Sequence, residues 1–273
     1  MAKEYKKVLF IAQELAPYVP QTDFALHTRR LAEGLQERGY EVRTFMPKYS
    51  CINERRNQLH EVIRLSGINI VIDDTDHPLI IKVATLQPTR MQVYFIDSDD
   101  FFSTENAKEL ETRLFPEEND ERMMFFVRGT IETVKKLRWE PAIVSCDGWI
   151  SSLVPVYLKR LYHDDPTFAN SKIIFNLPDD KFEGTLDERF IEKLKGVGLS
   201  DDDLATLGEG PVDCDALTRL AITYADAVAA LSPDIDPAMV AYAKECGIPV
   251  LEYQGEEGEP SATAEFYSLL LNQ

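Results

Sequence analysis

The chain has 273 residues, with 29 lysines and arginines against 47 aspartates and glutamates, so its formal net charge at pH 7 is −18. This length allows one large domain or two small ones, and a 44% hydrophobic composition is ordinary for a globular protein. An acidic surface repels phosphate backbones and anionic lipids. We therefore expect neither nucleic acid nor a membrane as a partner.

The first residues predict neither a secretory signal nor a membrane span. The apolar run at 8–12 ends before Glu14, whereas a signal needs about 7–15 apolar residues and a transmembrane helix about 20. The four cysteines and four histidines are dispersed along the chain, without the paired spacing of a metal site or a disulfide framework. These features indicate a cytoplasmic protein with reduced thiols and no metal or other cofactor.

The chain opens on a strand, a helix and a second strand. Residues 7–12 are an apolar run typical of a strand buried on both faces. Apolar residues then recur at helical spacing from Phe24 to Leu35, and Gly39 marks the end of that helix. A second strand is expected at 41–46. This order predicts a βαβ unit and therefore a parallel sheet.

A β-rich insertion is expected at about 59–97, where short apolar runs are separated by polar turns without an intervening helix. Such runs are typical of antiparallel hairpins. Alternation then resumes, and Thr185 with Glu188 has the form of a capping box. The later elements are expected as helices at 120–137, 150–162, 187–196, 213–225, from Ser232 and at 262–271, with strands at 142–146, 172–175, 227–231 and 249–253.

The whole of 1–273 is thus predicted to form one α/β domain, a Rossmann-like, doubly wound and mostly parallel sheet with a β-hairpin insertion. In such sheets ligands bind beyond the carboxyl ends of the strands. The corresponding loops are 13–23, 97–103, 146–151, 176–184 and 232–237. The first loop lacks G-x-G-x-x-G, and the chain contains no phosphate-binding G-x-x-x-x-G-K-[ST] motif, so neither device for dinucleotide or ATP binding is supported.

Several blocks resemble motifs of bacterial glycogen and starch synthases. The first strand runs into Glu14-Leu-Ala16-Pro17-Tyr18, which is similar to that family's E-x-A-P-[FY]. The other blocks follow in family order: 38–43 resembles R-G-H-E-V-R, 46–49 resembles M-P-x-Y, 118–126 resembles D-N-x-E-R-F-x-F-F, 146–155 resembles C-H-D-W-H-T-x-L-V-P, and 224–233 resembles Y-A-D-x-V-x-x-V-S-P.

This resemblance implies the N-terminal half of a GT-B glycosyltransferase. In that family two Rossmann-like halves face a cleft, and glucose passes from ADP-glucose or UDP-glucose to the end of an α-1,4-glucan. The N-terminal half holds the acceptor, and the C-terminal half binds most of the sugar nucleotide. We expect that C-terminal donor-binding domain to be absent from this chain, so that the cleft-facing side is exposed to a protein partner or a second copy.

The polar groups that the family uses are largely replaced. Its phosphate-binding loop K-T-G-G-L aligns with residues 20–24, where Pro20 has no charge or amide hydrogen and Asp23 adds a negative group. The histidine of D-W-H is Ile150, and the family's H-N aligns with Pro178 and Asp179. Each group of this kind supplies several kcal/mol of transition-state stabilisation.

We therefore predict a chain that is catalytically impaired on its own and acts as a glucan-, ligand- or partner-binding domain, with an α-glucan or a sugar nucleotide as the small ligand. The alternative is an active glucosyltransferase completed by a separate C-terminal chain, or a cleft repurposed for other chemistry. The candidate ligand-facing residues are Glu14, Tyr18, Gln21, Thr22, Asp23, Glu118, Asn119, Arg122, Asp147, Trp149 and Asp179.

Three of these candidates have a plain structural interpretation as well. The block at 119–122 is either an acceptor-binding cluster or a charged first turn of a helix. Trp149 either stacks on a sugar ring or fills space beneath its loop. Asp179 and Asp180 are either a carboxylate pair for acid–base work or a solvated turn.

Overall fold

The structure, a computed structural model, describes residues 6–102, 119–179 and 181–272. Its strands are β1 (Lys6–Ala12), β2 (Tyr40–Pro47), β3 (His60–Glu61), β4 (Ile68–Ile72), β5 (Thr75–Leu86), β6 (Met91–Asp97), β7 (Ile143–Asp147), β8 (Lys172–Asn176), β9 (Ala227–Ala229) and β10 (Val250–Leu251). Its α-helices are α1 (Asp23–Glu37), α2 (Asn119–Leu137), α3 (Val154–Val156), α4 (Phe190–Gly196), α5 (Asp201–Leu204), α6 (Cys214–Tyr224), α7 (Pro237–Glu245) and α8 (Glu259–Leu271).

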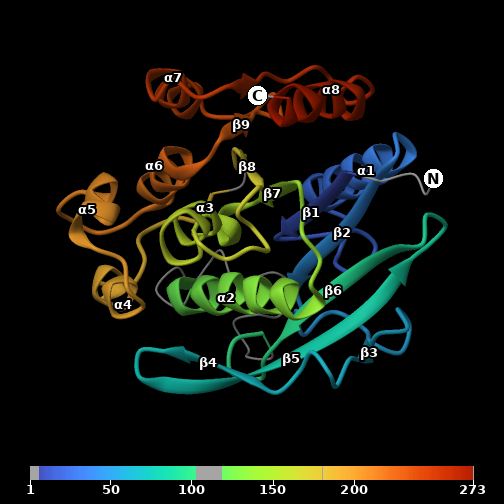
Figure 1. Cartoon of the computed structure of the whole chain (residues 1–273), viewed down its shortest axis with the longest axis horizontal. Coiled ribbons are helices and arrows are strands. Elements are labelled where there is room, and N and C mark those ends of the chain that lie inside the picture. The colour runs from blue at the N-terminus through green and yellow to red at the C-terminus, as the bar shows by residue number, and fades with distance from the viewer. Residues whose placement is uncertain (1–5, 103–118, 180, 273) are drawn as a thin grey trace.

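Within the described ranges the strands form one ten-stranded sheet in the order β10-β9-β8-β7-β1-β2-β6-β5-β3, with β4 paired to β5 (Figure 1). The six strands from β10 to β2 are parallel, and so is β6 beside β2. The central strand β1 is buried along its last five residues, as expected for a strand covered on both faces.

The strand order places helices on both faces of this sheet. The connection from β1 through α1 to β2 moves across the sheet in one direction, whereas the connections from β7 through α3 to β8, and through α6 to β9, move in the other. Since parallel crossovers are right-handed, α1 covers one face and α3 and α6 the other. On the α1 face, the C-terminal helix α8 packs against α1. The predicted α/β, doubly wound fold class is confirmed.

The β-rich insertion forms as a pair of hairpins. The long strand β5 is antiparallel to β4 on one edge and to β6 on the other, and β3 also pairs with it. The last strand, β6, returns to the main sheet parallel to β2. The insertion therefore extends the sheet beyond β2, away from the carboxyl ends of β7, β8 and β9.

Several helices differ from the prediction. In place of one helix over 150–162 the chain makes a 3₁₀ turn at Trp149–Ser151, the short α3, and a π-helical turn at Tyr157–Leu161. Pro155 lies in the first turn of α3. In a first turn the missing N–H of proline breaks no hydrogen bond, but a proline in the interior of a longer helix would break one. A single helix over 150–162 is therefore interrupted at this residue.

The other differences concern helix starts. The last helix, expected from 262, begins at Glu259, and the short α5 was not predicted. The capping box predicted at Thr185 is wrong: α4 begins at Phe190, and the capping box is formed by Ser200 and Asp203 at the start of α5. The helix expected from Ser232 begins instead at Pro237, because the Asp236 side chain accepts a hydrogen bond from the Ala238 amide. No helix in the described ranges is long and apolar enough to cross a membrane.

Candidate functional site

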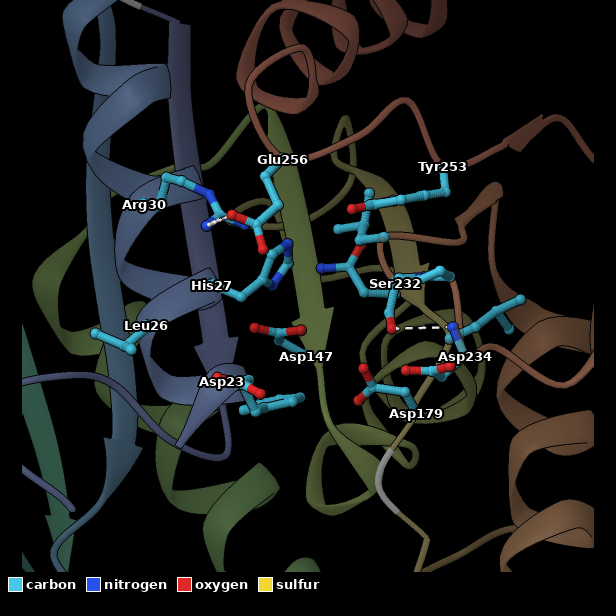
Figure 2. Close-up of a pocket in the computed structure, with 15 residues that line it drawn as sticks. Asp23, Leu26, His27, Arg30, Asp147, Asp179, Ser232, Asp234, Tyr253 and Glu256 are labelled. Atoms are coloured by element: carbon cyan, nitrogen blue, oxygen red, sulfur yellow. Dashed lines mark hydrogen bonds and ion pairs between the residues drawn. The ribbon is translucent and has the colours of Figure 1, made fainter. Parts of the chain in front are cut away.

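A pocket of about 470 Å³ opens at the carboxyl ends of β7, β8 and β9, beside the first turns of α1 (Figure 2). This is the edge at which an open α/β sheet binds ligands. The segment between β10 and α8 adds Tyr253 and Glu256 to the lining. The lining residues are Asp23, Phe24, Leu26, His27, Arg30, Asp147, Asn176, Leu177, Asp179, Leu231, Ser232, Pro233, Asp234, Tyr253 and Glu256.

The pocket is acidic. Five of its described lining residues are carboxylates, namely Asp23, Asp147, Asp179, Asp234 and Glu256, and Figure 2 shows Asp23, Asp147 and Asp179 directed toward the same opening. The basic lining residues, His27 and Arg30, are already paired. The guanidinium of Arg30 lies 3.0 Å from Glu256 and 3.4 Å from Glu259, and His27 contacts Glu259. A phosphate group would therefore meet repulsion here, whereas hydroxyl donors would meet acceptors.

Asp147 is the last residue of β7 and forms the floor of the pocket. Its side chain is buried and accepts a hydrogen bond of 2.7 Å from the Thr28 hydroxyl. Burial raises the pKa of Asp147 above its ordinary value, although the charge of His27 and hydrogen bonds from Thr28 and Asn176 oppose that rise. Asp147 is thus an acceptor held in place by α1.

Asn176, the last residue of β8, was not among the predicted site residues. Its Nδ2 donates to the Ser145 hydroxyl at 3.1 Å. Its Oδ1 is buried and has no hydrogen-bond partner in the described part of the chain, so an acceptor is available to a ligand at the pocket. The loop beginning at residue 176 was expected to border the site. Asn176 lies at the first position of that loop, but it was not singled out, because a lone asparagine at a strand end carries no motif.

A side chain at the start of α1 already bonds to one of its first-turn amides. The Thr22 hydroxyl accepts from the Ala25 amide at 3.0 Å and donates to the buried Glu14 carboxylate at 2.6 Å. Asp23 follows in the first turn. Helix N-termini attract anions through their free amides and dipole, but here one amide is bound and two carboxylates stand beside it. This end of α1 is poorly suited to a diphosphate.

The structure separates the predicted residues into groups. Asp23, Asp147 and Asp179 line the pocket, and Glu14 and Thr22 support its α1 side. Gln21 is exposed in the preceding loop. Tyr18 is buried edge-on against Phe95, with ring centroids 4.9 Å apart, and burial raises its pKa to about 12.

The other predicted residues lie elsewhere. Arg122 is buried and donates to the Phe101 carbonyl at 2.8 Å and to Asn119 Oδ1 at 2.7 Å, so these two residues fix a helix start against a loop rather than face the pocket. Trp149 is fully buried with its ring edge-on to Phe182, which favours the second of its two interpretations, that it fills space beneath its loop. Glu118 and Asp180 lie outside the described residues.

Neither metal binding nor thiol chemistry finds support at this site. In the ranges that the structure describes, no group of three or more His, Cys, Asp or Glu side chains could hold a metal ion. Cys146, next to Asp147, is fully buried, and burial raises the pKa of its thiol well above the ordinary value. A thiol in that state is not a nucleophile at neutral pH.

We expect a pH-dependent contribution of His27 to stability. Burial lowers the pKa of His27, but the hydrogen bond to Glu259 and the charge of Asp147 outweigh it, and the net shift is upward. When the pKa of a histidine is higher in the folded than in the unfolded protein, its protonation stabilises the fold. This stabilisation is complete below the unfolded-state pKa of about 6.5, and it is lost as the pH rises through the folded-state pKa. The His27→Gln variant should thus lose roughly 2 kcal/mol at pH 6.

Urea unfolding of both proteins between pH 6 and pH 9 measures this difference. The gap in unfolding free energy should narrow steadily as the pH increases. A gap of constant size across that range would show that the imidazolium charge contributes nothing.

Comparisons with known proteins agree with this fold. A family model for the starch synthase catalytic domain matches residues 7–248. The glycogen synthase of Chlorobium phaeovibrioides is 32% identical over 239 residues, covering 84% of this chain and 48% of that protein. The glycogen synthase of Chlorobaculum tepidum is 30% identical over 257 residues, covering 90% of this chain and 52% of that protein.

Among solved structures, the catalytic domain of starch synthase IV from Arabidopsis thaliana, bound to ADP and acarbose, superposes with a TM-score of 0.72. At 18% identity it covers 92% of this chain and 52% of that one, and it shows a common fold. The chain spans about half the length of the curated relatives that it matches. The resemblance predicted from the motifs is confirmed, and this chain belongs to the family of starch synthase catalytic domains.

Proposed function

We propose that the acidic pocket binds a hydroxyl-rich carbohydrate, such as the end of an α-glucan, and that these 273 residues do not by themselves transfer glucose from a sugar nucleotide. The observation that supports this most directly is the charge of the lining. Carboxylates accept hydrogen bonds, as does Asn176 Oδ1, which has no partner among the residues that the structure describes, and sugar hydroxyls donate them. The relatives named as glycogen synthases favour a glucan over other sugars.

The nucleotide side of the reaction lacks comparable support. A diphosphate would lie against the first turn of α1. There the Ala25 amide already donates to the Thr22 hydroxyl, and the Asp23 carboxylate repels anions. Ile150 is fully buried, so no polar group at that position reaches the pocket. Loss of a single preorganised donor commonly costs about 2.7–4 kcal/mol of barrier lowering, so several losses together are expected to abolish transfer.

Isothermal titration calorimetry of the purified chain with maltoheptaose, ADP and ADP-glucose tests this proposal. Maltoheptaose should bind, and at 100 times its dissociation constant it should add about 2.7 kcal/mol to the unfolding free energy. ADP and ADP-glucose should give neither heat nor stabilisation. A parallel assay with ADP-glucose and UDP-glucose on a glycogen primer should show no turnover. Turnover by the pure chain, or tight binding of ADP, would contradict the proposal.

The half-length match favours a second candidate, in which the pocket is one wall of a transferase site completed by residues outside these 273. Adding the C-terminal half of a related glycogen synthase should then restore transfer from ADP-glucose. If no sugar shifts the melting temperature but light scattering shows a defined oligomer, the exposed face instead serves a protein partner or a second copy.

A further inference from the structure

The C-terminal segment that closes the pocket comes after the family match, which ends at residue 248. Tyr253 and Glu256, which line the pocket, precede α8. In Figure 2 the Glu256 carboxylate lies beside Arg30 of α1, and Tyr253 lies across the opening from α1. The family comparison thus assigns nothing to this wall of the site, although the wall belongs to the same pocket.

One anchor holds this segment against α1. Glu259, the first residue of α8, is only 2% exposed and contacts both His27 and Arg30. Removing a carboxylate from water costs several kcal/mol, and well-packed apolar residues often dock a helix as well or better. A buried carboxylate at this position therefore contributes little net stability to the docking of α8 on α1. It does, however, fix the orientation of two residues that line the pocket.

A second anchor joins α8 to Ser145 of β7. Tyr267 of α8 is buried and donates its hydroxyl hydrogen to Ser145 Oγ at 3.1 Å. The same oxygen accepts from Asn176 Nδ2 at 3.1 Å. Ser145 Oγ thus uses both of its acceptor lone pairs, one toward Tyr267 and one toward Asn176. The Asp147 carboxylate also accepts from the Asn176 side chain, so both bonds hold the amide nitrogen of Asn176 toward β7. The Oδ1 atom is then left over for the pocket.

From these contacts we propose that residues 253–267 complete the carbohydrate site. Tyr253 and Glu256 contact the ligand, and Glu259 and Tyr267 are positioning residues that act through His27 and Asn176. This inference rests on the proposed function. A half-buried tyrosine offers an apolar ring face to the sugar, and Glu256 adds a hydroxyl acceptor on the side opposite Asp179.

The positioning role is tested first without any ligand. Tyr267→Phe removes one oxygen and keeps the ring, so the fold should survive. In an NMR spectrum of the full chain, the side-chain amide signals of Asn176 should move in this variant. They should stay in place in Glu265→Gln, which changes an exposed residue on the same helix. Unchanged Asn176 signals in Tyr267→Phe would overturn the relay through Ser145.

Affinity for maltoheptaose tests the rest. Tyr267→Phe should weaken binding about three- to tenfold, as expected for one misdirected hydrogen bond, and Tyr253→Ala should weaken it at least as much. In a protein that already carries Asn176→Ala, adding Tyr267→Phe should not change the affinity further, because the side chain that Tyr267 positions through Ser145 is then missing. The matched control Glu265→Gln should bind like the wild type.

The possible results separate the two proposals. A wild type that does not bind maltoheptaose contradicts the proposed function. A wild type that binds, with affinity unchanged in Tyr267→Phe and in Tyr253→Ala, contradicts the inference about the C-terminal segment and leaves the proposed function standing.

Discussion

Replacing Lys193 by methionine is expected to lower the unfolding free energy by about 3–5 kcal/mol, as measured by urea denaturation at pH 7. The Lys193 ammonium lies 2.7 Å from Asp120 and 2.7 Å from Glu121, and the side chains of Lys193 and Asp120 are 6% and 1% exposed. Without the lysine, a buried carboxylate at the start of α2 loses its nearest counter-charge. Because methionine has nearly the volume of lysine, the loss of unfolding free energy should come from the missing charge and not from a cavity.

The double variant Asp120→Asn/Lys193→Met should recover most of this loss, because it removes both charges together. Lys244→Met is the surface control. Its partner Glu252 is exposed, and exposed pairs contribute only about 0–1 kcal/mol. An effect of Lys193→Met as small as that of Lys244→Met would mean that the buried pair is not needed to hold α4 against α2.

The variant Gly34→Ala should destabilise the protein by about 1–3 kcal/mol. A Cβ atom at Gly34, within α1, would lie 2.6 Å from Cβ and 2.9 Å from Cγ of Pro260 in α8. Both are atoms of a rigid ring, so α8 as a whole has to move away. Alanine within a helix normally gains about 1 kcal/mol over glycine, and the clash must exceed that gain. Affinity for maltoheptaose should fall with stability, because α8 carries the anchors of the pocket.

Gly196→Ala is the matched control for this variant. Gly196 ends α4, and nothing lies within 4 Å of the Cβ that alanine would add there. This change should leave stability unchanged or raise it slightly. If thermal unfolding shows that both glycine variants gain stability, α8 does not pack tightly on α1 in solution.

The central sheet could be predicted from the sequence because its signals are local. The run at 7–12 is short and contains β-branched and aromatic residues, which favours a strand. Gly39 marks the end of a helix because it adopts a positive φ of 87°. Of the five loops expected to border a site, 13–23, 146–151, 176–184 and 232–237 contribute residues to the pocket, and the described residues of 97–103 contribute none. The carboxyl edge of a parallel sheet follows from strand order, but the place of a pocket along that edge does not. Asp147 and Asp179 were found on that basis.

What the sequence did not predict depends on contacts between distant segments. Glu259 and Tyr267 look like ordinary residues of a terminal helix, and their importance comes from His27 and Ser145, more than 100 positions away. Trp149 follows a strand at the predicted edge, yet it turns inward to Phe182. Burial of this kind results from packing, which periodicity does not describe.

The most direct test of the central claim is a crystal structure of the chain soaked with maltoheptaose and ADP together. We predict glucose units in the pocket, with hydroxyls on Asp147 and on Asn176 Oδ1, and no nucleotide at the start of α1. Density for a diphosphate against the Asp23 end of α1, with the pocket free of sugar, would contradict the account.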